Sequence, residues 1–92
     1  MNMTNKQKEI PSGHIDVEFK REILIAGVKT KSVRMREPTV GDHLAAEEAK
    51  GGGSAVEIAL LANLCMLAPD DIHKLPLREY KQLQAAVSLF ID

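Results

Sequence analysis

Hydrophobic and polar residues alternate along the first part of the chain and then change to a helical spacing. Ile15, Val17 and Phe19 alternate with charged residues, and this period of two is typical of a strand with one buried face. The period lengthens to about 3.6 residues after Pro38, which indicates helices. The sequence therefore predicts an α+β fold, in which an N-terminal β-hairpin packs on about three C-terminal helices.

The tip of the hairpin is predicted at Gly27. Ala26-Gly27 is the local turn signal between the first strand, which runs to Ile25, and a second polar, β-branched run at residues 28–35. Glycine takes a positive φ at little cost, as such a turn requires. Both strands have one apolar face, and an isolated hairpin is marginal in water, so helices must cover that face.

The first helix is predicted at residues 39–50, beginning at a Thr-x-x-Asp capping box. Its spacing turns Val40 and Leu44 inward. It ends at the glycine triplet 51–53, because glycine loses more backbone entropy in a helix than any other residue. The triplet lacks the Lys-Ser/Thr ending of a phosphate-binding loop, and we interpret it as a linker.

Two further helices and a short helical turn are expected. A Ser54-x-x-Glu57 capping box opens a helix to about Leu67, which is apolar on most of its circumference and so belongs in the middle of the domain. The short turn follows near residues 69–75, and Pro76 starts a final helix that runs to about Ile91. One face of this final helix carries Leu77, Tyr80, Leu83, Val87 and Phe90.

The first twelve residues are polar, and the chain has 92 residues in all. Residues 1–12 have too few apolar side chains to offset the entropy of ordering, and we predict a disordered tail there. Residues 13–92 are predicted to form a single α+β domain.

The two parts of the chain carry opposite charge. Residues up to Arg36 include eight basic and four acidic side chains, a net charge of +4, and the remainder includes four basic and nine acidic side chains, a net charge of −5. Such asymmetry favours docking of the hairpin on the helices as much as binding of an external partner.

No motif for catalysis, a cofactor or a metal is found. His14, His43 and His73 lie in different predicted elements and have no zinc-ligand spacing with Cys65. A nucleophile elbow is absent, and Cys65 lies among apolar residues that predict a buried, inert thiol. We expect a protein without enzymatic activity. The single Cys, the polar N-terminus and the lack of a membrane-length apolar run predict a cytoplasmic location.

Basic residues of the second strand leave a nucleic-acid alternative open. Lys29, Lys31, Arg34 and Arg36 could contact phosphates if a two-stranded ribbon entered a DNA groove. The acidic helices and the lack of interleaved aromatic residues argue against this. A solvated strand face that protects an exposed sheet edge is the stronger interpretation.

The order of these elements and one junction carry a family resemblance. The junction reads Met35-Arg36-Glu37-Pro38-Thr39-Val40-Gly41-Asp42, between a hairpin with a glycine at its tip and an apolar helix. Over roughly residues 15–90 the chain resembles the tail assembly chaperones of Mu-like bacteriophages. The resemblance implies a chaperone in the bacterial host cell that binds the tape measure protein and keeps it soluble during tail assembly. The alternatives are a phage-encoded nucleic-acid-binding accessory protein and a structural tail subunit.

The partner-binding surface is predicted on the terminal helix, at Leu83, Val87 and Phe90. These residues lie near the C-terminal end, where packing against the hairpin is hardest to complete, so part of their stripe should receive an amphipathic helix of the partner. Two alternatives remain at this point. All three residues could belong to the core, or surplus apolar surface could be buried in a homo-oligomer.

Overall fold

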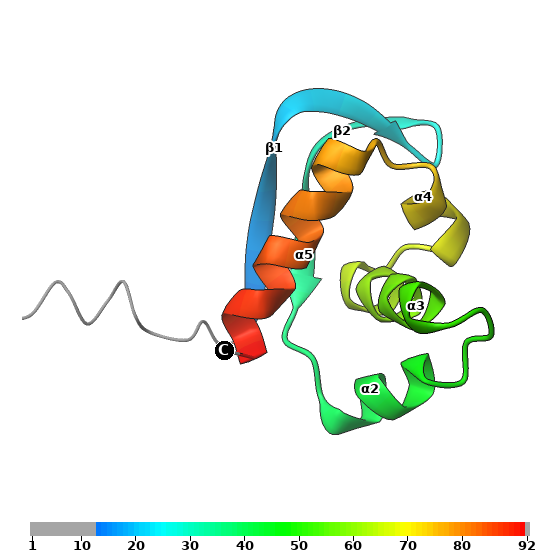
Figure 1. Ribbon diagram of the computed structural model, residues 1–92. Helices are drawn as coiled ribbons and strands as arrows, with labels where there is room; N and C mark the ends of the chain where they lie inside the picture. The colour runs from blue at the N-terminus through cyan, green and yellow to red at the C-terminus, as the bar shows by residue number, and fades with distance from the viewer. Residues whose placement is uncertain (1–12, 92) are drawn as a thin grey trace, which may run out of the picture.

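The computed structural model describes residues 13–91. The elements follow the order β1 (His14–Ile25), β2 (Val28–Arg36), α2 (Val40–Ala46), α3 (Gly53–Cys65), α4 (Pro69–His73) and α5 (Leu77–Ile91) (Figure 1). The predicted α+β fold, with an N-terminal hairpin and helices after it, is confirmed. The tail predicted at residues 1–12 lies outside the described residues.

The strands pair antiparallel and meet at a two-residue turn. Ile25 pairs with Val28, so Ala26 and Gly27 form the turn, with φ angles of 52° and 79°. Positive φ at both positions is the geometry of a type I′ turn, whose twist matches that of the flanking strands. The tip predicted at Gly27 is confirmed.

We expect Ala26→Asn to stabilise the hairpin turn. Ala26 is a non-glycine residue at positive φ, and asparagine tolerates this conformation better than alanine does. The free energy of unfolding should rise by about 0.5 to 1 kcal/mol, measured by urea denaturation. Ala26→Val is the control, because a β-branched residue should destabilise the same turn. An Asn variant less stable than the parent would contradict this account of the turn.

A bulge interrupts the pairing of the strands and bends β1. His14 to Glu18 pair in register with Arg36 to Ser32, but the next partners are Ile23 and Thr30, so β1 carries extra residues in between. Extra residues on one strand increase its bend and twist. In Figure 1, β1 accordingly curves over the beginning of α5.

The core lies between the hairpin and helices α3 and α5. Met35, Leu61, Leu64 and Leu83 have almost no exposed surface, and Phe19 from the bulged part of β1 joins the same cluster. Helix α3 contacts α2, α4, α5 and β2, which confirms its predicted place in the middle of the fold.

Three predicted helix boundaries differ from those of the structure: the end of α2 and both ends of α3. Helix α2 ends at Ala46 rather than at residue 50, because the backbone tightens after it, with the N–H groups of residues 48 and 49 bonding three residues back. Helix α3 begins at Gly53 with Gly52 as its N-cap, and no side chain caps it. Ser54 therefore lies inside the helix, and the predicted Ser54-x-x-Glu57 capping box does not form.

Helix α3 also ends earlier than residue 67, because Met66 takes a left-handed conformation with φ of 57° and stops the helix. Helix α4 then starts with the Asp71 carboxylate accepting a hydrogen bond from the Ala68 N–H at 3.0 Å, the role expected of an acidic residue there. Helix α5 begins at Leu77, one residue after Pro76, whose carbonyl accepts the first helical hydrogen bonds.

Candidate partner-binding site

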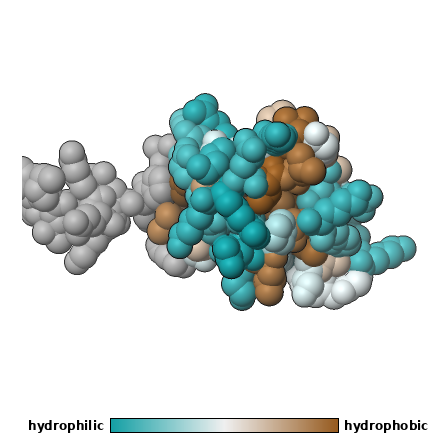
Figure 2. Space-filling view, turned by 90° about the horizontal axis from the view of Figure 1, so that it is seen from above, coloured by the Kyte–Doolittle hydropathy of each residue, from teal (hydrophilic) through white to brown (hydrophobic). Residues whose placement is uncertain are grey.

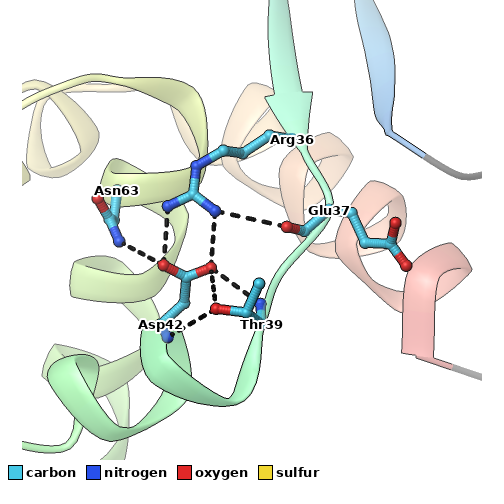
Figure 3. Close-up of polar contacts among 5 residues, drawn as sticks. All are labelled: Arg36, Glu37, Thr39, Asp42 and Asn63. Atoms are coloured by element: carbon cyan, nitrogen blue, oxygen red, sulfur yellow. Dashed lines mark hydrogen bonds and ion pairs between the residues drawn. The ribbon is translucent and has the colours of Figure 1, made fainter.

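An ion pair fixes the junction between β2 and α2. The two terminal nitrogens of Arg36 donate to the two carboxylate oxygens of Asp42, at 2.7 Å for Nη1 to Oδ2 and 2.8 Å for Nη2 to Oδ1 (Figure 3). A bidentate Arg–carboxylate pair holds both groups in one orientation. Arg36 is the last residue of β2 and Asp42 lies in the first turn of α2, so the pair sets the angle at which the helix leaves the strand.

Three further hydrogen bonds converge on the same carboxylate. The N–H of Thr39 donates at 2.9 Å, its hydroxyl at 3.1 Å, and the side-chain amide of Asn63 in α3 at 3.0 Å (Figure 3). The Asp42 N–H donates back to the Thr39 hydroxyl at 3.2 Å, which completes the predicted capping box. Arg36 and the donors around it hold the pKa of the Asp42 carboxyl well below its usual range.

This low pKa predicts a specific acid dependence of stability. Because the folded pKa of Asp42 is depressed, its stabilisation is fully present above the unfolded value of about 4 and is lost as the pH falls towards the folded value. The free energy of unfolding should therefore fall less steeply below pH 4 in Asp42→Asn than in the parent, measured by urea denaturation from pH 2 to 7. Parallel curves for the two proteins would contradict this.

Anchoring Asp42 also orients helix α2. Asp42 and Ala46 face α3 and are buried, whereas Val40 is 75% and Leu44 is 59% exposed. The prediction that Val40 and Leu44 turn inward is therefore wrong. The polar junction takes the inner side of this short helix and leaves its apolar side in solvent.

A second ion pair joins the hairpin to α5. The Arg21 guanidinium in the bulge donates to both carboxylate oxygens of Glu79, at 3.2 Å and 3.1 Å, and the Glu79 side chain is fully buried. The pair lowers the pKa of Glu79. Two ion pairs, Arg21–Glu79 and Arg36–Asp42, thus join the basic hairpin to the acidic helices, in addition to the apolar core between them. The sequence analysis did not single out Arg21, although a charged residue that continues the phase of the apolar residues of β1 was a signal for a polar contact at this position.

A third polar contact connects α3 to α5. The Tyr80 hydroxyl and the Gln84 side-chain amide both donate to the Glu57 carboxylate. Burial, together with this carboxylate, raises the pKa of Tyr80 to about 12. The Glu57 carboxylate thus accepts hydrogen bonds from α5 rather than forming the predicted capping box.

The remaining candidate groups show no catalytic arrangement within residues 13–91. Cys65 is buried, as predicted, and burial raises the pKa of its thiol to about 11, so it stays protonated near neutral pH. In this part of the chain, no three His, Cys, Asp or Glu side chains gather around a common point where an ion could bind. None of the described helices combines the length and the apolar character that crossing a membrane would require.

An apolar groove lies where α2, α3 and the end of α5 approach one another. Its volume is about 330 Å³, and it is lined by Pro38, Thr39, Val40, His43, Leu60, Val87 and Ile91. The exposed side of α2 forms one wall, and the last turn of α5 forms the opposite one. Few polar atoms face the groove, as in many binding sites for apolar ligands.

The three residues of the predicted partner-binding stripe belong to the core. Leu83, Val87 and Phe90 are 1%, 7% and 6% exposed in the described chain. The exposed apolar residues of α5 are instead Leu77, Leu89 and Ile91. Of the three predicted residues, Val87 lines the groove. A role of the three residues in partner binding stays a prediction.

A comparison with protein families identifies the chain. A family model described as phage tail assembly chaperone proteins, E, or 41 or 14, matches residues 16–92. The chain belongs to this family of phage tail assembly chaperones. The resemblance inferred from the sequence is therefore confirmed, and the match includes the whole Arg36–Asp42 junction and every residue that lines the groove. Neither a curated protein nor a solved structure matched the chaperone.

Membership of this family indicates that the two ion pairs stabilise the fold rather than take part in catalysis. The family of tail assembly chaperones is non-enzymatic, and membership of it implies binding of a tail protein partner. In this chaperone, the Arg36–Asp42 and Arg21–Glu79 pairs connect elements of the fold, while large apolar side chains on α2 and α5 remain exposed.

Proposed function

We propose that this chaperone binds the phage tape measure protein in the host cytoplasm and keeps it soluble while the tail is assembled. One observation carries the proposal beyond family membership. Large apolar side chains remain exposed on α2 and α5: Val40, Leu44, Leu77, Leu89 and Ile91. A protein that holds a long helical partner in solution needs accessible apolar surface of this kind.

Apolar and polar side chains are interleaved on the surface. Figure 2 shows brown hydrophobic areas between teal polar ones on the face it draws. A polar surround keeps a small domain soluble while its apolar side chains contact a partner. This arrangement suits reversible binding better than permanent burial.

The test is co-expression of the chaperone with the tape measure protein from the same genome. We expect the soluble fraction of the tape measure protein to rise with the chaperone, but not with an unrelated small α+β domain. The two proteins should also co-purify, and the complex should persist in salt because apolar contacts dominate it. An insoluble tape measure protein in both cultures would overturn the proposal.

Two other outcomes would favour the alternatives. Submicromolar binding to duplex DNA that weakens steeply with salt would favour the nucleic-acid hypothesis. Two of the four basic residues behind that hypothesis are already paired within the chain, Arg34 with Asp16 at 2.8 Å and Arg36 with Asp42. Stoichiometric amounts of the chain in finished particles would favour a structural tail subunit.

A further inference from the structure

We propose that the groove between α2, α3 and α5 binds an amphipathic helix of the partner whose apolar face is flanked by Lys or Arg residues. The inference rests on the proposed function and specifies the surface and the chemistry of the segment bound. Three features of the groove support it: its apolar walls, the scarcity of polar side chains along it, and the charge around it.

The walls of the groove are apolar side chains that the core does not use. Val40 on α2 is 75% exposed and Ile91 on α5 is 68% exposed, and Leu60 and Val87 form the floor between them. Leu44, one helical turn after Val40, continues the exposed side of α2. A volume of about 330 Å³ accommodates a few aliphatic side chains, such as those at successive turns of a helix.

The groove favours a helix over an extended segment. An extended chain would bring unpaired N–H and C=O groups into the groove, where each needs a hydrogen-bond partner. Among the lining residues only Thr39 and His43 carry polar side chains, and the Thr39 hydroxyl is already bonded to Asp42. A helix satisfies its own backbone and presents only side chains, so it suits these walls.

The charge around the groove favours a helix with basic residues beside its apolar face. No Lys or Arg is among the lining residues, and Arg36 at the adjoining junction is paired with Asp42. Helix α5 ends at the groove without a basic residue in its last turn, so its C-terminal carbonyls leave a partial negative charge there. Glu47, which contacts the lining residue His43 at 3.1 Å, adds an acidic side chain. Lys or Arg beside the apolar face of the partner complements this field.

The first test removes apolar side chains from the groove. In the double variant Val40→Ser/Ile91→Ser, affinity for the tape measure protein should fall by about tenfold or more, measured on the purified full-length chain. The matched control is Leu24→Ser/Val28→Ser, two residues near the hairpin tip that are 65% and 63% exposed. This control should bind as the parent does, and both variants should keep the parent's far-UV circular dichroism.

The second test reverses a charge beside the groove. Glu47→Lys should weaken binding several-fold at low salt, and the difference from the parent should shrink as salt screens the charges. Glu22→Lys is the control, because it makes the same change at an exposed position of β1. If Glu47→Lys bound the tape measure protein as tightly as the parent or more tightly, the inference that Lys or Arg residues flank the bound helix would be overturned.

The outcomes separate this inference from the proposed function. If the parent binds the tape measure protein and Val40→Ser/Ile91→Ser binds it equally well, the groove assignment is overturned while the proposed function stands. If the parent does not bind, the proposed function fails and the inference fails with it. If the double variant converts a parent dimer into a monomer in sedimentation experiments, the groove is an interface between two copies, and the inference is overturned.

Discussion

Phe90→Ala should strongly destabilise the chaperone. Phe90 is 6% exposed and packs in the core near the C-terminal end of α5. Removing a buried Phe side chain costs about 3 to 5 kcal/mol, which is a large part of the roughly 5 to 14 kcal/mol expected for a domain of this length. The measurement is the free energy of unfolding from urea denaturation, with the thermal midpoint as a second readout.

The adjacent residue provides a matched control for this prediction. Leu89 is 56% exposed on the same turn of α5, so Leu89→Ala should change stability little. A Phe90→Ala protein with the parent's thermal midpoint but reduced affinity for the tape measure protein would contradict the core assignment. It would instead support the surface role that the sequence predicted for Leu83, Val87 and Phe90.

Asp42→Asn should produce the second large effect. The Asp42 carboxylate accepts hydrogen bonds from Arg36, Thr39 and Asn63, and its side chain is only 10% exposed. An amide in its place turns an NH₂ group towards these donors and leaves the Arg36 charge without its partner. We expect a loss of about 2 to 3 kcal/mol in the free energy of unfolding at pH 7.

A second Asp–Arg pair offers the control for Asp42→Asn. Asp16 and Arg34 face each other across the strands at 2.8 Å, but both side chains are about half exposed or more. Solvent screens such a pair, so Asp16→Asn should leave the thermal midpoint nearly unchanged. If the two Asn variants lose the same amount of stability, the special role of the Arg36–Asp42 junction is refuted.

The hairpin and the terminal helix were predictable because local signals determine them. Gly27 belongs to the one residue pair that can form a tight turn between two alternating runs, and the structure places the turn there. The period of α5 is long enough that Leu83 and Val87 are placed on one face by spacing alone, although spacing did not decide between a core face and a partner-binding face, and the structure buries both residues. The type and position of such elements can be predicted without knowing what they pack against.

The orientation of α2 could not be predicted from its apolar residues. The helix has seven residues, too few for a period to define a face, and Val40 and Leu44 outweigh Ala46 in any hydrophobicity count. Its inner side is decided by Asp42, whose partners Arg36 and Asn63 lie in other elements. A contact between distant residues thus overrides the local pattern.

The bulge in β1 and the Arg21–Glu79 pair were missed for a related reason. The apolar–polar alternation of β1 stops at the three charged residues Lys20, Arg21 and Glu22, but nothing local reports that the partner strand has fewer residues at that point. The half-exposed Arg21 side chain pairs with the buried Glu79, which lies 58 residues later in the sequence. The groove depends in turn on α2 and α5, whose relative placement follows from these long-range contacts.

Hydrogen–deuterium exchange of the chaperone, alone and in its complex with the tape measure protein, tests the central claim most directly. We expect exchange to slow at Val40–Ala46 and in the last turns of α5, the two walls of the groove, while the hairpin turn at Ala26 and Gly27 is unchanged. Slower exchange confined to the hairpin, with α2 exchanging as in the free chain, would contradict it.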